Sequence, residues 1–206
     1  MATLAASDIY FMYTGTATGT SNNTLSLGGT MNTSTIADNT ANNIFDDVTG
    51  DESTSGTVEY RCIAVKDSHA TAQMLNAKVW ITGYVRAGTS NDVISFAIEQ
   101  TIGAGSLINV LANEWAAPAQ PFTVPAAGGG TVAWTAEGAP SSTLTFGTVN
   151  AAGGWFGLWL RRSVPVTASA YSNRAVTIQV QCETTGSPRE IMTKQYVINF
   201  AGALPL

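Results

Sequence analysis

Two long stretches of the chain, residues 57–82 and 154–183, alternate between apolar and polar positions in the manner of β-strands. Each contains two strand-like segments joined by a polar stretch rich in turn-forming residues. The segment 57–65 has apolar side chains on both faces and is expected to be buried on both, whereas the segment 77–81 has one apolar and one mixed face. Two such hairpin-like units in one chain predict a β-sandwich.

Shorter alternating segments complete the pattern of an all-β protein with about nine or ten strands. They are residues 8–13, 93–100, 131–138, 142–149 and 195–200. We therefore expect an antiparallel β-sandwich. The strand pattern leaves open whether the connections are those of a jelly roll or of an immunoglobulin-like fold.

The N-terminal part of the chain has a different composition. Residues 14–24 are almost entirely Thr, Gly, Ser and Asn, which cannot support a packed core. We therefore divide the chain into an extended N-terminal arm with short strands, residues 1–43, and a β-sandwich domain, residues 44–206. The low-complexity segment is either a flexible linker or an arm that becomes ordered against a neighbouring surface. Its candidate contact residues are Thr14, Asn22 and Asn23.

Charged residues make up only 11% of the 206 residues, against about 25% in an ordinary soluble domain. This composition suits a surface covered by neighbouring subunits, although an all-β domain with small polar residues on exposed strands is the simpler alternative. The net charge of −5 argues against nucleic-acid binding, which needs a basic face. No signal peptide opens the chain and no apolar run is long enough for a membrane span, so we expect synthesis in the cytoplasm and no membrane partner.

Residues 46–53 concentrate four carboxylates, those of Asp46, Asp47, Asp51 and Glu52. Oxygen-rich loops of this kind bind Ca²⁺ when several carboxylates converge. The spacing departs from the EF-hand pattern, and a solvated acidic turn without a metal is the favoured alternative. No other cofactor is expected.

Tryptophans are candidates for a binding surface. Trp155 and Trp159 share one face of a predicted strand, which fits either a carbohydrate platform or packing in the core or at a subunit interface. Packing is favoured because no acidic or amide partners lie nearby. Trp115, which precedes Pro118 and Pro121, is predicted to anchor a loop.

The arginines allow two interpretations. Arg161 and Arg162 are adjacent and must point to opposite faces of their strand. Arg61 and Arg162 either pair with Glu59 or with the acidic stretch of the same chain, or they contact carboxylates of a neighbouring subunit.

No catalytic motif is present in the sequence. His69 is the only histidine and lies in a polar turn, where it cannot readily join a triad. Cys62 and Cys182, the only cysteines, lie in predicted strands and are either buried free thiols or a disulfide across the sandwich. We therefore expect that the protein is not an enzyme.

Three segments resemble a recurrent type of tailed-bacteriophage structural protein. In that type an acidic Asp-Glu-Ser stretch precedes Glu-Tyr-Arg-Cys, and the strands Ala-Lys-Val-Trp-Ile and Trp-x-Arg-Arg-x-Val-Pro follow. The matching residues are Asp51, Glu52, Glu59–Cys62, Ala77–Ile81, Trp159, Arg161, Arg162, Val164 and Pro165. The resemblance covers residues 42–185 but not the first forty, and it implies a virion structural protein.

The leading hypothesis is a capsid decoration or cement protein on the exterior of the particle. It would bind the major capsid protein or other virion proteins across adjacent capsid subunits, as a homo-oligomer such as a trimer. The alternatives are a tail, neck, baseplate or receptor-binding component, and a carbohydrate-binding module that uses Trp155 and Trp159.

Overall fold

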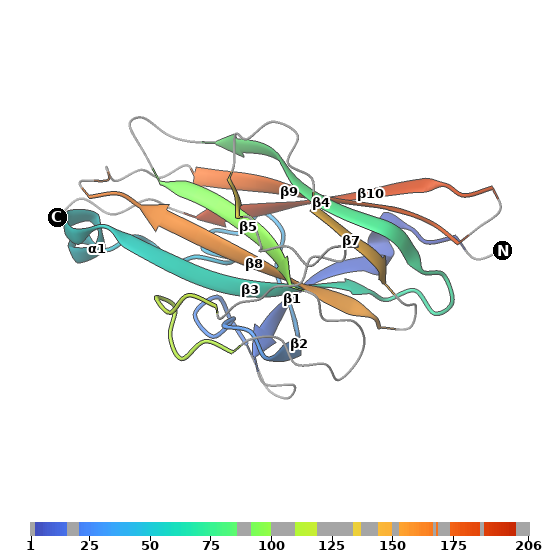
Figure 1. Cartoon of the computed structure of the whole chain (residues 1–206), viewed down its shortest axis with the longest axis horizontal. Coiled ribbons are helices and arrows are strands. Elements are labelled where there is room, and N and C mark those ends of the chain that lie inside the picture. The colour runs from blue at the N-terminus through green and yellow to red at the C-terminus, as the bar shows by residue number, and fades with distance from the viewer. Residues whose placement is uncertain are drawn as a thin grey trace.

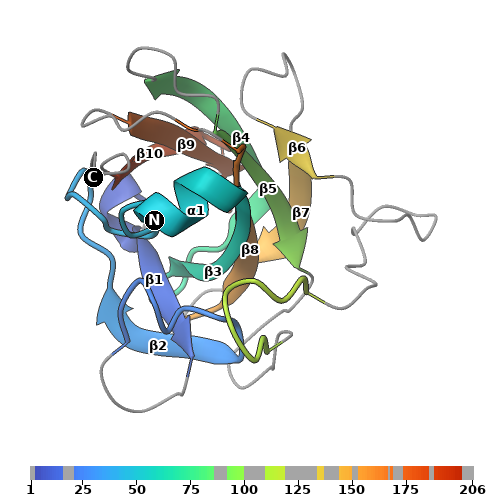
Figure 2. The same ribbon diagram turned by 90° about the vertical axis from the view of Figure 1, so that its left-hand side faces the viewer.

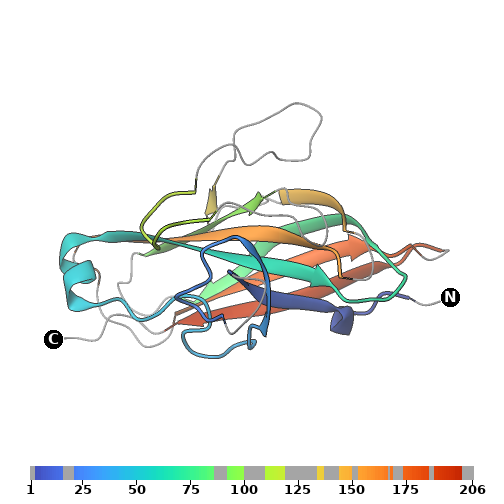
Figure 3. The ribbon, with the colours of Figure 1, turned by 90° about the horizontal axis from the view of Figure 1, so that it is seen from below.

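The computed structural model is a sandwich of two antiparallel β-sheets (Figure 1). The larger sheet has the strand order β2-β1-β3-β8-β5-β6, and the smaller has the order β10-β9-β4-β7. Helix α1 lies at one end of the sandwich and the N-terminus at the other (Figure 3). The expected fold class is confirmed. The structure describes residues 3–15, 21–85, 92–99, 110–118, 134–136, 144–149, 153–166, 168, 174–185 and 188–200.

The strands and helices of the described residues have the following bounds. The larger sheet contains β1 (Ile9–Gly15), β2 (Thr30–Thr35), β3 (Thr57–Asp67), β5 (Val93–Glu99), β6 (Thr135–Ala136) and β8 (Trp155–Val164). The smaller sheet contains β4 (Met74–Val85), β7 (Leu144–Val149), β9 (Arg174–Glu183) and β10 (Ile191–Phe200). The helices are η1 (Ala6–Asp8), a 3₁₀ turn, and α1 (Gly50–Ser55).

The two hairpin-like units of the sequence are not hairpins. β3 belongs to the larger sheet and β4 to the smaller, and β8 and β9 are divided in the same way. β3 pairs instead with β8, and β4 pairs with β9. Each unit is therefore an arch that crosses from one sheet to the other. The two arches together form the centre of the sandwich.

The main core lies between the sheets and is built by the inward side chains of both. β9 shows this most regularly, because buried and half-buried residues alternate along its whole length. The larger sheet also buries its other face. There Cys62, Ala64, Trp155 and Trp159 form a second apolar cluster, separate from the main core. β3 is thus buried on both faces, as predicted.

The described part of residues 1–43 belongs to the sandwich itself, in contrast to the expected extended arm. β1 lies between β2 and β3 in the larger sheet. Leu4, Ile9, Phe11 and Ile36 are all in the main core. Phe11 also stacks on Tyr196 of the smaller sheet, with ring centroids 4.3 Å apart. Removal of this region would take strands and core residues from the domain.

The segment after β2 closes one edge of the sandwich. Asn39 and Asn43 donate backbone hydrogen bonds to the carbonyls of Val197 and Asn199 in β10, at 3.1 and 3.4 Å. The segment thereby occupies part of the free edge of β10 and continues towards α1. It brings the side chains of the next residues to the end of the sandwich where β3 begins.

Candidate functional site

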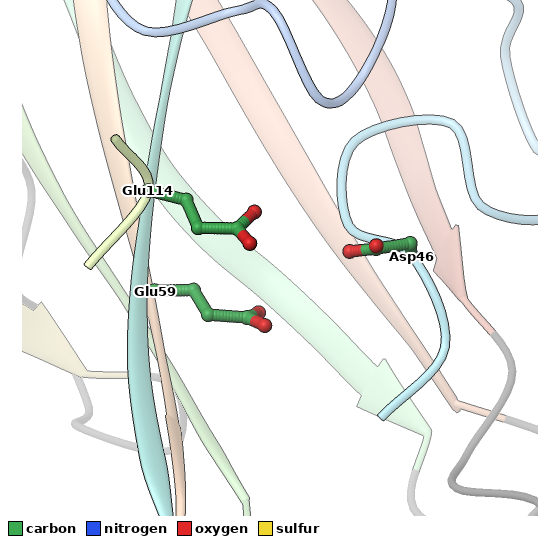
Figure 4. A group of neighbouring side chains, drawn as sticks. All are labelled: Asp46, Glu59 and Glu114. Atoms are coloured by element: carbon green, nitrogen blue, oxygen red, sulfur yellow. The ribbon is translucent and has the colours of Figure 1, made fainter. Parts of the chain in front are cut away.

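A cluster of charged side chains lies at this end of the sandwich. Glu59 and Arg61 project from the inner face of β3, and Arg162 of β8 is opposite Glu59 in the strand register. Asp46 comes from the segment before α1, and Glu114 from a segment that lies against β3. Figure 4 shows the three carboxyl groups gathered at one place. We call these five residues the charge cluster.

The arginines of the charge cluster are paired within the chain. Nε and Nη2 of Arg162 lie 2.7 and 2.6 Å from Oε2 of Glu59, and its Nη1 donates to the Asp46 carbonyl at 2.7 Å. Nη2 of Arg61 donates to the Glu114 carboxylate and lies 3.5 Å from Oδ1 of Asp46. Both arginine side chains are fully buried. The intrachain interpretation is therefore confirmed, and neither arginine is available to a neighbouring subunit in this structure.

The ring of Phe45 holds both guanidinium groups from one side. Cζ of Arg162 lies 5.0 Å from the ring centroid and Cζ of Arg61 lies 5.7 Å from it. Contacts of this kind are attractive because a cation meets the negative face of the ring. Phe45 is fully buried and immediately precedes Asp46. One short segment thus contributes both an aromatic ring and a carboxylate to the two arginines.

Glu59 is the most buried acid of the cluster. Its side chain is 1% exposed, whereas that of Asp46 is 47% exposed. Burial raises the pKa of Glu59 to about 7, although Arg162 and Arg61 act in the opposite direction. The cluster therefore contains a carboxyl group whose protonation changes near neutral pH.

A metal ion would compete with the arginines of the cluster. Oxygen atoms of Asp46, Glu59 and Glu114 lie within 4.8 Å of one another, close enough for shared ligation. The same carboxylates already contact Arg61 and Arg162, and two guanidinium charges at this point repel a cation. In this structure these carboxylates therefore serve as ion-pair partners of the two arginines.

The four residues of the suggested Ca²⁺ loop have separate roles. Asp46 belongs to the charge cluster, and Asp47 follows it outside α1. Asp51 and Glu52 lie in the first turn of α1, and the Glu52 carboxylate accepts the Thr49 N–H at 2.7 Å. The side chain of Thr49 accepts the Glu52 N–H in return. Part of the acidic stretch is therefore the first turn of a short helix with a capping box. The Thr-x-x-Glu spacing of this box could have predicted the start of α1 from the sequence.

Trp155 and Trp159 are buried in the second apolar cluster, not displayed on the surface. The indole N–H of Trp159 donates to the buried carboxylate of Glu99. Core packing is therefore confirmed over a sugar platform or a subunit contact for these two residues. Arg161 lies on the same face, and its Cζ is 4.9 Å from the ring centroid of Trp134.

Two segments, 21–29 and 110–116, lie side by side over the second apolar cluster, and we call them the cover (Figure 2). They are joined by a hydrogen bond from the Leu111 N–H to the Leu27 carbonyl, at 2.9 Å. The side chains of both leucines pack into the cluster. The cover therefore shields the apolar outer face of the larger sheet from water, as the smaller sheet shields its inner face.

The cover is bound to the backbone of β3. The N–H groups of Cys62 and Tyr60 donate to the carbonyls of Ser26 and Glu114, at 2.7 and 2.8 Å. Thr14 reinforces this attachment, because its Oγ1 donates to the Cys62 carbonyl at 2.7 Å and accepts the Gly28 N–H at 3.0 Å. The cover thus takes the place of a neighbouring strand where β1 no longer pairs with β3.

The candidate contact residues of the predicted arm occupy different environments. Thr14 is fully buried, so in this structure it serves the fold and cannot meet a neighbouring subunit. Asn22 is exposed, and its side-chain oxygen accepts the Leu25 N–H at 3.1 Å. Asn23 is half-buried. Only the two asparagines remain accessible for the expected contact.

Apolar side chains project outwards from the cover. Trp115 is 59% exposed, Val110 is 70% exposed and Leu25 is also exposed. The exposure of Trp115 shows that the loop-anchor prediction was wrong. The sequence offered no sign of this, because a tryptophan before prolines fits an anchor and an exposed side chain equally well.

His69 has a local structural role. Its Nδ1 accepts the backbone N–H groups of Thr71 and Ala72, at 3.1 and 2.8 Å. Its own N–H donates to Asp67 Oδ1 at 2.9 Å. The imidazole thereby closes the turn between β3 and β4. Cys62 and Cys182 are buried free thiols, so the disulfide is not formed.

Comparison of the chain with protein-family models and with curated proteins finds no match. Within the described residues, no helix has the length and apolarity needed to cross a lipid bilayer. Function must therefore be argued from the surface and the charge cluster.

Proposed function

We propose that this chain is a non-enzymatic structural protein of a tailed-bacteriophage virion, and specifically a capsid decoration protein. In this proposal it binds on the exterior of the particle across adjacent capsid subunits and stabilises the head. Many copies, assembled as homo-oligomers, multiply a modest contact into a stable shell. The sequence resemblance over residues 42–185 suggested this class of protein.

The observation that carries the proposal is the exposed apolar surface of the cover. Leu25, Val110 and Trp115 project from segments that contain a single charged residue, Glu114, whose carboxylate is engaged by Arg61. Aromatic and uncharged residues are typical of the central part of protein–protein interfaces. We infer that the cover meets an equally uncharged surface of a capsid subunit.

The low proportion of charged residues in the whole chain supports the same inference. An isolated soluble protein normally keeps a charged surface free of apolar patches. The proposal that the chain is not an enzyme is supported by the structural roles of several titratable groups. His69 closes a turn, and Arg61, Arg162 and Arg174 each pair with a carboxylate.

Attachment to particles that lack the protein would test the role of the cover. We expect Val110→Ser to weaken attachment of the purified protein at least tenfold, because it puts a hydroxyl group into an apolar contact. Ile191→Ser is the matched control. Ile191 is 71% exposed, as Val110 is at 70%, but it lies at the start of β10 in the other sheet.

Equal attachment of both variants and the unmodified protein would contradict a role for the cover. A failure of the unmodified protein to attach to any head, with attachment to tails instead, would move the proposal to the tail, neck or baseplate class. The carbohydrate-binding alternative has lost its support, because Trp155 and Trp159 are buried.

A further inference from the structure

The charge cluster contains one more acid than base. Three carboxyl groups, those of Asp46, Glu59 and Glu114, meet the two guanidinium groups of Arg61 and Arg162. If all five groups are ionised, the cluster has a net charge of −1, and Glu59 is its one fully buried acid, because Asp46 and Glu114 are partly exposed. A buried carboxylate that faces two other carboxylates is the group on which proton uptake removes this excess at the lowest cost.

We propose that the charge cluster binds one proton, on Glu59, while segments 44–48 and 110–118 are docked on the sandwich. Loss of this proton weakens the docking of segment 110–118. The inference concerns the domain alone and does not depend on the proposed function.

The geometry around Glu59 leaves room for this proton. Both contacts from Arg162, at 2.7 and 2.6 Å, are made to the same oxygen, Oε2. A proton on Oε1 therefore leaves these contacts intact. Carboxylate oxygens of Glu114 and Asp46 lie within 4.8 Å of a Glu59 oxygen (Figure 4). The protonated acid thus has anionic neighbours that stabilise it, and the cluster as a whole becomes neutral.

Charged groups reach Glu59 from each element packed against it. β3 and β8 contribute the two cations, the segment before α1 and the segment 110–118 contribute one anion each, and α1 contributes Glu52, which acts to raise the pKa of Glu59. Asp92, next to β5, is bound at 3.0 Å by Arg174 of β9 and is thereby neutralised within its own pair. The excess negative charge at Glu59 is consequently not cancelled by these neighbours.

Segment 110–118 is the part of the structure that we expect to respond to deprotonation of Glu59. Glu114 is its only charged residue and holds it to Arg61. When Glu59 is ionised, it repels Glu114 and draws the same guanidinium groups towards itself. The backbone bond from Tyr60 to the Glu114 carbonyl, at 2.8 Å, then holds the docked segment with less support.

The direction of the pH effect follows from the raised pKa of Glu59, which is about 7 in the folded protein and has an ordinary value of 4.5. Between these values the folded state binds more protons than the unfolded state, so stability falls as the pH rises. The contribution of Glu59 is complete below pH 4.5 and is lost as the pH passes 7. The equilibrium constant for unfolding should rise on the order of 100-fold over this range from Glu59 alone.

The experiment compares the full-length protein with Glu59→Gln and Glu190→Gln by denaturant unfolding at several pH values from 5 to 8.5. The amide of Glu59→Gln imitates the protonated acid, so we expect its stability to fall less between pH 5 and 8 than that of the unmodified protein and to exceed it at pH 8. Glu190, which is exposed, gives a control with the same chemical change, and its variant should retain the unmodified protein's pH dependence.

Titration of the Glu59 carboxyl group in the unmodified protein tests the proposal even if the Glu59→Gln variant fails to fold. Carbon-13 NMR of the unmodified protein should show the Glu59 carboxyl group titrating between pH 6 and 8. Over the same range, amide exchange in 110–118 should accelerate beyond the intrinsic effect of pH, and exchange in β9 should not. A Glu59 carboxyl that titrates below pH 5, or a Glu59→Gln variant that is folded and less stable at every pH, would overturn the proposal.

Discussion

The outer faces of the two sheets are built in opposite ways. In the smaller sheet, β9 buries every second residue and leaves the others half-exposed, so its outer face meets solvent directly. In the larger sheet, β3 and β8 are buried on both faces, and the outer face needs the cover to exclude water. Strict alternation of buried and half-buried residues along a strand thus indicates a sheet that packs against another layer on one face only. A continuous run of apolar residues indicates a sheet that is covered on both faces.

This difference explains why two segments without strand structure pack on the outer face of the larger sheet. The outer face of the smaller sheet is left half-exposed along β9, whereas that of the larger sheet is covered by 21–29 and 110–116, from distant parts of the sequence. These segments are attached through backbone groups of β3 and through Thr14. Loss of the cover would consequently expose the second apolar cluster, which includes the buried Trp155 and Trp159.

The largest expected effect comes from breaking the second apolar cluster under the cover. Trp159→Ala should destabilise the protein by about 3–5 kcal/mol, because it leaves a cavity and removes the donor to the buried Glu99 carboxylate. Gln181→Ala on the outer face of β9 should change stability by less than about 0.5 kcal/mol. Urea unfolding checks both values. Similar effects of the two substitutions would contradict the comparison of the two faces.

A smaller effect is expected from loosening the attachment of the cover. Thr14→Val keeps the shape of the side chain but leaves the Gly28 N–H without its partner, which should cost about 1–3 kcal/mol. Thr33→Val, at an exposed position of β2, is the control.

Thiol labelling under native conditions locates the effect of Thr14→Val. Burial raises the pKa of Cys182 to about 12 and also raises that of Cys62, so both thiols should react slowly at pH 8. The variant should speed the labelling of Cys62, which lies under the cover, and leave Cys182 unchanged. Equal acceleration of both thiols would indicate global unfolding and not release of the cover.

The sequence predicted most of the layer structure because periodicity reports burial directly. The double burial of β3 and the opposite directions of Arg161 and Arg162 both follow from the two-residue repeat of a strand. Which strands pair does not follow from it. The connection 68–73 between β3 and β4 is rich in turn formers, but it is also long enough to cross the roughly 10 Å between packed sheets, so hairpin and arch look alike in the sequence.

The charge cluster was only partly accessible to prediction. An intrachain pair between Arg162 and Glu59 could be anticipated, but their opposition depends on the register between β3 and β8. The contribution of Glu114 depends on a segment that is remote in sequence and carries no strand pattern. Such long-range contacts follow from tertiary packing, which a single sequence does not specify.

The most direct test of the proposed function is the number of copies of this chain in purified phage particles, measured by quantitative mass spectrometry against the major capsid protein. We predict a ratio between one copy per capsid subunit and one copy per few capsid subunits. A few copies to a few dozen per particle would contradict the decoration role and place the protein in the tail or neck. Its absence from the particle would contradict a virion function altogether.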